Sequence, residues 1–270
     1  MHQLIGRVAV VTGAGSGIGR CTALELADKG CALALVDVDA TGLAGTLEAV
    51  ERGGAKASAH VADVSSAERM AELPDEVLAA HSACHILVNN AGVLSVGQFA
   101  DESLDTIRWI VGINVFGMLH GCHYFLPLLR QSDEAHIVNV SSMAAFAGIP
   151  QNATYSLTKG AVRSFTEALR GELVGTNVGV STLFPGAVGT DIMERARGAQ
   201  AERLAAFGRT AIAPYLRRPP EAAARQIVRA IEHDRVRVLL GPDARALDVF
   251  ARVLPGRTGL VGRALNRITG

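Results

Sequence analysis

The feature of this sequence that most constrains its fold is the alternation of short apolar runs with longer helical patterns. Between residues 8 and 240 the apolar runs read as strands, and most of the segments between them are long enough to form a helix. The runs are apolar throughout rather than at every second residue, so we expect helices to cover both faces of the sheet. The predicted strands are Val8–Thr12, Ala32–Val36, Ala57–Val61, Ile86–Asn89, Ile137–Ser141, Gly179–Phe184 and Val236–Leu240.

This order of elements predicts an α/β fold with a doubly wound parallel sheet, in which ligands bind beyond the carboxyl ends of the strands. The chain has 270 residues, and no Pro/Gly/Ser-rich linker, low-complexity tract or repeat divides it. We therefore predict a single domain over residues 1–270.

Charge and hydropathy argue against several classes of protein. Lys and Arg together number 26, as do Asp and Glu, so the formal net charge is zero and no general attraction to nucleic acid or to an anionic membrane is expected. The longest apolar stretches, such as Cys31–Val36, are far shorter than the roughly 18 residues of a membrane span. The first residues do not resemble a signal peptide, and we expect a cytoplasmic protein.

The cysteines and histidines do not indicate a metal site. The four cysteines are scattered and form no CxxC pair, which argues against a disulfide framework and against zinc. Two His/Cys groups, at residues 81–85 and 120–123, lack the full set of ligands that a metal needs. We therefore assign no metal.

A glycine-rich turn follows the first predicted strand and precedes a helical pattern over residues 20–29. Glycines let the backbone turn sharply and approach a phosphate, and the N-terminus of the next helix offers free N–H groups. The spacing is T-G-x-x-x-G-x-G rather than G-x-G-x-x-G. The turn predicts a pyrophosphate site formed by Gly13, Gly15, Ser16, Gly17, Ile18 and Gly19.

A second nucleotide signal is Asp37, at the end of the second predicted strand. A carboxylate at this place accepts hydrogen bonds from the adenosine ribose and repels a 2′-phosphate, and Val38 offers no compensating cation. Two unit charges about 4 Å apart interact by roughly 4 kcal/mol at an effective dielectric of 20. The sequence therefore favours NAD over NADP, and the structural alternative for Asp37 is a helix cap or turn residue.

Tyr155 and Lys159 are four residues apart in a helical pattern, which puts both side chains on one helix face. A phenol with a pKa of about 10 is a poor base at neutral pH. The Lys159 ammonium and the positive charge of an oxidised nicotinamide would lower the pKa of Tyr155, which could then take a hydroxyl proton. An exposed pair without function is the alternative for two such residues alone.

A strand-like run ends in Ser142, at the edge of the sheet where ligands should bind. Its hydroxyl could hydrogen-bond a substrate oxygen and stabilise the charge that develops on it. A serine that merely ends a strand is the alternative. Asn114 interrupts an apolar helical run over residues 110–119, where asparagine is a mediocre helix former and a local reason for it is expected; a tolerated polar residue on a wet face is the other interpretation.

These motifs together resemble the short-chain dehydrogenase/reductase family. The resemblance covers roughly residues 6–241 and rests on T-G-x-x-x-G-I-G at 12–19, Asn89-Asn90-Ala91-Gly92, Asn114, Ser142, Tyr155-x-x-x-Lys159 and Pro185-Gly186. It implies a single Rossmann-like domain with a seven-stranded parallel sheet and a nicotinamide cofactor.

The resemblance also implies a role for each matching residue. Tyr155 would be the acid/base, Ser142 would position the substrate oxygen, and Lys159 would bind the nicotinamide ribose and lower the pKa of Tyr155. Asn114 would hold a water that links Lys159 to solvent. Further cofactor-binding positions would be Asp63 and Val64 at the adenine, Asn90, Ala91 and Gly92 in the cleft, and Pro185, Gly186, Val188 and Thr190 at the nicotinamide.

The residues that the resemblance places near the substrate are mainly apolar. We therefore expect an apolar small molecule, with Gln151 and Asn152 as polar anchors. The apolar positions are Leu94, Val96, Ala144, Phe146, Ile149, Ala187 and Val188.

Two regions break the strand–helix alternation. Residues 190–220, with six arginines that include Arg195, Arg197 and Arg209, predict either a lid over a ligand or a solvated helical excursion. The C-terminal extension, 243–270, is apolar and basic together, which favours packing against another subunit or the substrate pocket over contact with a membrane surface.

The function that the sequence predicts is an NAD(H)-dependent oxidoreductase that interconverts a secondary alcohol and its ketone. One alternative is an NAD-retaining epimerase or dehydratase. It is disfavoured because that branch of the family has longer chains with a different glycine spacing. The other is an NAD(H)-binding sensor or scaffold without turnover, which would not need an acid/base pair. Because relatives usually assemble, we expect a homo-oligomer, either a dimer or a homotetramer.

Overall fold

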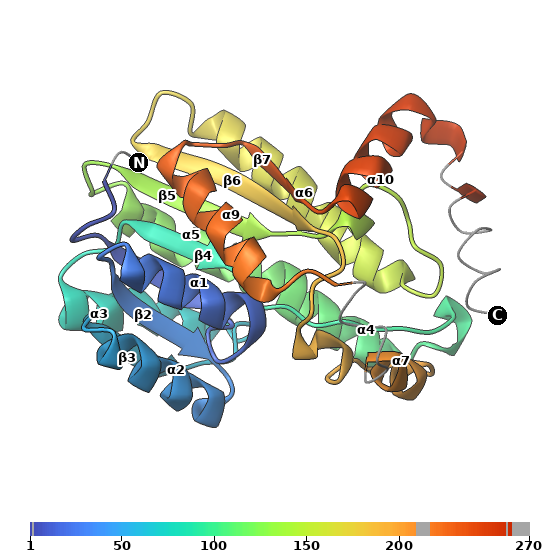
Figure 1. Ribbon diagram of the computed structural model, residues 1–270, viewed down its shortest axis with the longest axis horizontal. Coiled ribbons are helices and arrows are strands. Elements are labelled where there is room, and N and C mark those ends of the chain that lie inside the picture. Colours follow the sequence, from blue (N-terminus) through green and yellow to red (C-terminus); the bar gives the residue numbers. More distant parts are fainter. Residues whose placement is uncertain (2, 209–216, 258, 261–270) are drawn as a thin grey trace.

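A single seven-stranded parallel sheet forms the centre of the molecule in the computed structural model, which describes residues 1, 3–208, 217–257 and 259–260 (Figure 1). The strand order is β3-β2-β1-β4-β5-β6-β7, and every pair is parallel. All seven predicted strands are present, with ends that shift by at most two residues. Their bounds are β1 Val8–Thr12, β2 Ala32–Asp37, β3 Ala57–Val61, β4 Ile86–Asn89, β5 Ala135–Val140, β6 Val178–Pro185 and β7 Arg237–Leu240.

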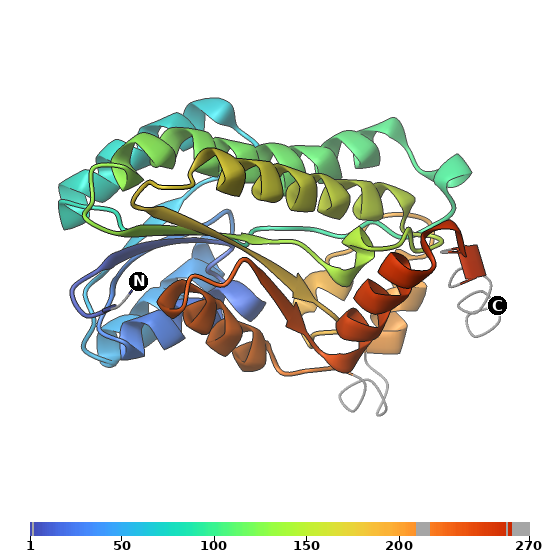
Figure 2. The same ribbon diagram turned by 90° about the horizontal axis from the view of Figure 1, so that it is seen from above.

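Helices cover both faces of the sheet, as the all-apolar strands predict (Figure 2). One apolar cluster joins one sheet face to α1 (Gly17–Asp28), α2 (Ala40–Arg52) and α9 (Pro220–Glu232). The other joins the opposite face to α3 (Ala67–His81), α5 (Gly117–Leu129) and α6 (Ala153–Glu172). The architecture is therefore the Rossmann-like doubly wound fold.

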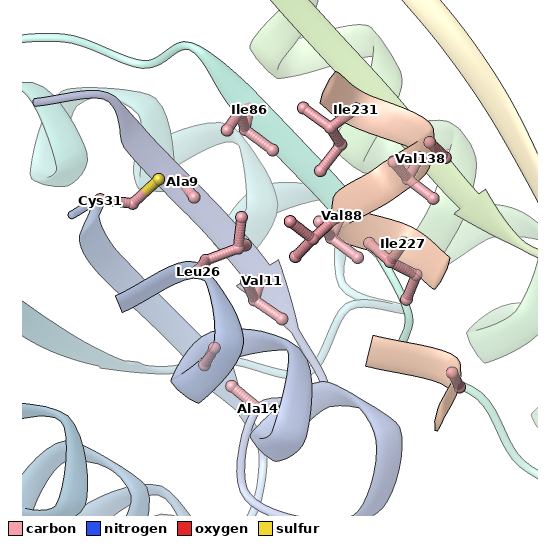
Figure 3. Packing of buried hydrophobic residues seen from close by; sticks show 14 of the residues in the cluster. Ala9, Val11, Ala14, Leu26, Cys31, Ile86, Val88, Val138, Ile227 and Ile231 are labelled. Atoms are coloured by element: carbon pink, nitrogen blue, oxygen red, sulfur yellow. The ribbon is translucent and has the colours of Figure 1, made fainter. Parts of the chain in front are cut away.

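Strand β1 shows how one short run serves both layers. Ala9 and Val11 pack into the first cluster, in which Leu26 of α1 and Ile227 of α9 close over the centre of the sheet (Figure 3). Val8 and Val10 belong to the cluster on the other face. Because successive side chains of a strand point to opposite faces, only a run that is apolar throughout can be buried on both sides.

The longest apolar helix begins as α4 (Leu104–Val111), passes through a π-helical stretch at Gly112–Phe116 and continues as α5. Its 26 residues are long and apolar enough to cross a membrane by length and composition alone. In this fold its apolar side packs on the sheet, where Phe125 and Leu129 are fully buried. Packing against the sheet therefore accounts for the apolar composition of this helix.

The two regions outside the alternation lie at the end of the sheet where the strands end (Figure 1). The region 190–220 contributes a short 3-10 turn at Asp191–Met193 and α7 (Ala201–Gly208). The extension begins with α10 (Pro242–Val253) and a 3-10 turn at Pro255–Arg257. The predictions for 209–216, which include Arg209, and for 261–270 lie outside the described residues.

Candidate active site

The carboxyl ends of β1, β2, β4, β5 and β6 open into one cavity of about 390 Å³. This is the end of the sheet at which a doubly wound fold binds its ligands. The cavity brings together residues that are far apart in the sequence and were predicted separately. Of the predicted cofactor and catalytic residues, it is lined by Gly13, Ser16, Gly17, Ile18, Asp37, Asp63, Val64, Asn90, Ala91, Gly92, Ser142, Tyr155, Lys159, Pro185, Gly186, Val188 and Thr190.

The glycine turn is fastened to the segment after β4 by the Thr12 and Asn90 side chains. Thr12 Oγ1 accepts hydrogen bonds from the backbone N–H groups of Asn90 and Ala91, at 3.0 and 3.1 Å. Asn90 Nδ2 donates to the Thr12 carbonyl at 2.9 Å and to the Gly13 carbonyl at 3.3 Å. These bonds tie two loops from neighbouring strands into one rigid floor of the cavity.

Gly19 does not line the cavity, but its lack of a side chain lets α1 pack closely against the glycine turn. A Cβ atom at Gly19 would lie 2.0 Å from the Gly13 carbonyl oxygen, so only glycine permits the close approach of α1 to the turn. Gly13 has a φ of +67°, in the left-handed region that favours glycine. The two glycines therefore serve backbone geometry, and the N-terminus of α1 is left facing the cavity.

Asp37 ends β2 with its carboxylate buried and held by backbone groups. Its Oδ2 accepts a hydrogen bond from Gly15 N–H at 2.8 Å, and its Oδ1 accepts one from Asp39 N–H at 2.9 Å. Gly15 therefore orients the acid rather than lining the cavity. Asp37 is thus both a turn residue, as the structural alternative held, and a carboxylate on the wall of the cavity.

Asp63 and Val64, which the resemblance places at the adenine, lie in a turn. Side-chain contacts that the sequence analysis did not predict hold this turn in place. Asp63 Oδ1 accepts hydrogen bonds from the backbone N–H and the hydroxyl of Ser65. The Val64 carbonyl lies 2.9 Å from His120 Nδ1, which reaches it from α5. The sequence singled out His120 only as a candidate ligand, and this contact depends on helix packing that no local pattern reports.

Asn114 is buried within the π-helical stretch, so the interpretation as a tolerated residue on a wet face is wrong. Its Nδ2 donates to the Val93 carbonyl at 2.9 Å, and its Oδ1 accepts from Val93 N–H at 2.8 Å. Nδ2 also lies 3.1 Å from the Thr158 hydroxyl. The local reason for an asparagine is therefore to fasten the segment after β4 to α6.

Tyr155 and Lys159 come from the first two turns of α6 and lie on one helix face, as predicted. Lys159 is 4% exposed; its Nζ donates to the Val140 carbonyl at 3.1 Å and lies 5.8 Å from the centre of the Tyr155 ring. The Ser141 hydroxyl donates to the Lys159 carbonyl at 2.8 Å. The end of β5 thus holds the helix that carries the pair.

The surroundings shift both pKa values of this pair. Burial raises the pKa of Tyr155, and a hydrogen bond with Ser142 opposes the shift. Burial lowers the pKa of Lys159 to about 8. The lowering of the Tyr155 pKa that the sequence predicts is therefore absent in the protein alone, because desolvation outweighs the other influences.

The turn at Pro185–Ala187 is held from the C-terminal region. Asp243, in the first turn of α10, accepts a hydrogen bond from Ala187 N–H through Oδ2 at 2.8 Å. A Cβ atom at Gly186 would lie 2.1 Å from the same oxygen, so the backbone must be glycine there. The sequence offers no signal for this contact, since Asp243 follows a different strand.

The far end of the cavity is mainly apolar, and several of its residues were predicted. Leu94, Ala144, Ile149, Ala187, Val188 and Asn152 line it. Three further predictions are not met, because Val96, Phe146 and Gln151 do not line it. Phe146 instead packs against Phe184, with ring centres 4.6 Å apart, and under the Arg237 guanidinium. The sequence analysis missed other lining residues, which include Ala62, Val93, Ile113, Val140, Ser141 and Met143. Asp191, Ile192, Met193 and Arg195 also line the cavity and belong to the 190–220 region, for which a lid was one of the two predictions.

No group of three or more His, Cys, Asp or Glu side chains that could hold a metal ion occurs among the residues that the structure describes. All four cysteines are free. Burial raises the pKa of Cys31, Cys84 and Cys122 to about 12, which keeps these thiols protonated.

Comparison with known proteins agrees with this geometry. The family model of the short chain dehydrogenases matches residues 7–201, a stretch that carries the glycine turn, Asn114, Ser142, Tyr155 and Lys159. The chain belongs to the short-chain dehydrogenase/reductase family. Members of this family are oxidoreductases, and that general activity extends to this chain.

Two similar proteins and one solved structure span nearly the whole chain. SadH of Mycobacterium tuberculosis, assigned as an oxidoreductase, is 36% identical over 94% of this chain and 93% of its own. The 1-deoxy-11-beta-hydroxypentalenate dehydrogenase of Streptomyces avermitilis is 34% identical over 88% of this chain and 85% of its own. A short-chain dehydrogenase/reductase of Burkholderia phymatum, solved in complex with NAD, is 33% identical with a TM-score of 0.87, covering 94% of this chain and 95% of the other.

Proposed function

We propose that this short-chain dehydrogenase/reductase interconverts a secondary alcohol and its ketone, with NAD(H) as cofactor and Tyr155 as the acid/base. The observation that carries the proposal is the convergence of Ser142, Tyr155 and Lys159 on the cavity that the glycine turn also lines. A protein that only binds a dinucleotide does not need a phenol and an ammonium beside the substrate space.

The residues present fit a nicotinamide dinucleotide. At the centre of the cavity, a Cβ atom on Gly92 would lie 3.2 Å from both Lys159 Nζ and Asn114 Oδ1, so glycine keeps this space open. The Lys159 ammonium has three donors, and Val140 accepts from it at 3.1 Å. The glycine turn and the α1 N-terminus suit a pyrophosphate, and Asp37 suits a ribose diol.

The chemistry that a bound nicotinamide supplies is the acceptance or donation of a hydride. The chain's own residues would handle the proton and the charge. In the oxidising direction Tyr155 would take the proton of the substrate hydroxyl, and in the reducing direction it would return one to the ketone oxygen. Ser142 would hydrogen-bond the same oxygen and hold it at the phenol.

Lys159 would make this proton transfer possible at neutral pH. With a pKa of about 8, its ammonium is mostly charged at pH 7. A fixed positive charge in a cavity of low polarity favours the phenolate form of Tyr155 and so opposes the effect of burial. A cofactor cation would act in the same direction.

We also propose that NAD(H) is preferred over NADP(H). Asp37 presents a buried carboxylate to the cavity, and its oxygens are fixed by Gly15 and Asp39. A 2′-phosphate beside it would meet like charge. The NAD complex of the Burkholderia phymatum protein supports the same preference.

The substrate end favours an apolar alcohol or ketone. Its lining is dominated by aliphatic side chains, such as Leu94, Ile149 and Val188, with Asn152 as a polar group. The dehydrogenase of Streptomyces avermitilis carries the name of a hydroxylated pentalenate as its substrate. A cyclic or terpenoid secondary alcohol is therefore the first class to test.

The experiment is to follow NADH formation by the purified protein with cyclic, terpenoid, steroid and short-chain secondary alcohols, with NAD and NADP in parallel. Turnover of an apolar secondary alcohol with NAD, lost in Tyr155→Phe, is the expected result. NADH binding without turnover across the panel would contradict the proposal and favour a non-catalytic NAD(H)-binding protein.

A further inference from the structure

The segment from Thr190 to Gln200 contributes five residues to the lining of the cavity and is fastened to the loop after β4. Arg197 N–H donates to the Leu94 carbonyl at 3.0 Å, and Val96 N–H donates to the Arg197 carbonyl at 2.9 Å. Gln200 N–H adds a third bond to Val96 at 3.2 Å. The segment is therefore a strap, with its own short ladder of backbone bonds at the substrate end.

A side-chain contact reinforces the strap at this end. The Arg197 guanidinium stacks on the ring of Trp109 in α4, 4.0 Å from the ring centre. A guanidinium over an indole face is attracted by the ring quadrupole. Trp109 is the sole tryptophan of the chain, so all tryptophan fluorescence comes from the residue that makes this contact.

A second side chain of the strap, Arg195, lies two residues before Arg197 and contacts the segment after β2. Its Nη2 lies 3.2 Å from Asp39 Oδ2, two residues beyond Asp37. Arg195 itself lines the cavity, and among the described lining residues it and Lys159 are the basic ones. The ion pair thus connects the strap to Asp39, the residue that caps the start of α2.

The two oxygens of Asp39 have separate tasks. Oδ1 accepts hydrogen bonds from the N–H groups of Thr41 and Gly42 and so caps α2, whereas Oδ2 faces Arg195. Both Asp39 and Arg195 are partly exposed, at 35% and 54% of their side chains, so the pair can open without unfolding its surroundings. A partly exposed ion pair of this kind can break and re-form while the fold stays intact.

We propose that the ion pair between Arg195 and Asp39 is a latch that holds the 190–200 strap over the bound dinucleotide and sets the rate at which the cofactor leaves. This inference rests on the proposed function, since it requires that NAD(H) occupy the cavity. In this proposal Arg195 belongs to the strap and helps to retain the cofactor through its ion pair with Asp39.

A second explanation gives the opposite result for one substitution, which makes the latch testable. If Asp39 and Arg195 acted on the anionic cofactor only through their charges, loss of the Asp39 charge would remove a repulsion and slow cofactor release. If the two residues form a latch, loss of either charge opens the strap and speeds release. Asp39→Asn separates the explanations, because asparagine keeps the oxygen that caps α2.

The test is the rate of NADH release, followed by stopped-flow fluorescence after mixing the NADH complex with excess NAD. We expect Arg195→Gln and Asp39→Asn each to speed release by about two- to fivefold, the range for exposed ion pairs, and the double variant to match the single ones. Raising the salt concentration should speed release from the wild type and leave the variants nearly unchanged. Arg52→Gln, which breaks an exposed pair with Glu48 on α2, is the matched control and should behave as wild type.

A second readout does not depend on turnover. Acrylamide quenching of Trp109 should decrease when NAD binds the wild type, because the strap closes, and should decrease less in Arg195→Gln. Unchanged or slower release from Asp39→Asn would overturn the latch while leaving NADH binding intact. Failure of the wild type to bind NADH or NADPH would overturn the proposed function, and the latch with it.

Discussion

The side-chain amide of Asn114 pairs with both main-chain groups of Val93, through Nδ2 to the carbonyl at 2.9 Å and from the N–H to Oδ1 at 2.8 Å. This is the pairing that a neighbouring strand would supply, and a helix supplies it instead. Val93 can therefore lie outside the sheet, next to the cavity, with both of its backbone groups paired. The π-helical stretch at Gly112–Phe116 includes the residue that does this.

Replacing Asn114 by alanine leaves the N–H and the carbonyl of Val93 without partners. We expect Asn114→Ala to lower the free energy of unfolding by about 1–3 kcal/mol, the cost of orphaned buried polar groups. Urea denaturation monitored by circular dichroism measures the change. Thr158→Val removes the third contact of Asn114 and the hydrogen bond from the Thr158 hydroxyl to the Tyr155 carbonyl, but it leaves both groups of Val93 paired. It should therefore cost less, and an equal loss in both variants would contradict this account.

Tyr155→Phe removes the phenolic hydroxyl, with its hydrogen bond to Ser142, and keeps the ring. We expect kcat to fall by about two to four orders of magnitude, the usual worth of a general acid or base, with the Kd of NADH nearly unchanged. NADH formation and NADH fluorescence titration measure the two quantities. Tyr124→Phe, on α5 away from the cavity, is the matched control, and comparable activity of the two variants would exclude Tyr155 as the acid/base.

Asp37→Asn removes a charge and keeps an oxygen that can accept from Gly15 N–H. We expect the ratio of kcat/KM for NADPH over NADH to rise on the order of 10- to 100-fold, because like-charge repulsion of a 2′-phosphate is lost. Asp63→Asn changes a carboxylate elsewhere on the cavity wall and should leave the ratio within about threefold of wild type. A ratio that is constant across all three proteins would refute the role of Asp37.

His136 gives the free energy of unfolding a pH dependence far from the cavity. Burial lowers its pKa to about 4, against 6.5 for the exposed side chain. Between pH 4 and 6.5 the unfolded chain therefore binds a proton at His136 that the folded chain does not bind. The free energy of unfolding falls as the pH falls from 6.5 to about 4. The full loss should be roughly 3 kcal/mol.

Denaturation curves at pH 4, 5 and 6.5 test this effect. The slope of stability against pH should be smaller in His136→Gln than in the wild type. His233→Gln, an exposed histidine at the end of α9, is the control and should keep the wild-type slope. Equal slopes in all three proteins would show that His136 is not the group responsible.

The strands were predictable because their signal is local. Val8–Thr12 and Ile86–Asn89 occur in the structure with the bounds expected from their apolar runs. Tyr155 and Lys159 share a helix face for an equally local reason, the i to i+4 spacing. Residue patterns marked Asn114 only as an unusual residue in an apolar helix. Its partner Val93 could not be predicted, because Val93 lies on a loop 21 residues earlier whose path no local pattern indicates.

Contacts between distant loops account for what was missed. Phe146 is apolar and close to Ser142 in sequence, yet it packs against Phe184 and Arg237 on the other side of its turn. Asp243 and Arg195 reach the site from segments after β7 and β6, and their partners are set by the route of the chain in three dimensions. A pattern with a period of two or of 3.6 residues carries no information about such partners.

The hydrogen bond from Ala187 to Asp243 bears on how the molecule is assembled during synthesis. The side of the cavity that carries the glycine turn and Asp37 is formed by β1, β2 and β4, which are complete once residue 89 has been made. The turn at Pro185–Ala187 lacks its acceptor until residue 243 has been made, when about nine-tenths of the chain exists. A growing chain therefore has one half of this cavity long before the other, and a protein shortened before Asp243 would keep the first half and lose the anchor of the second.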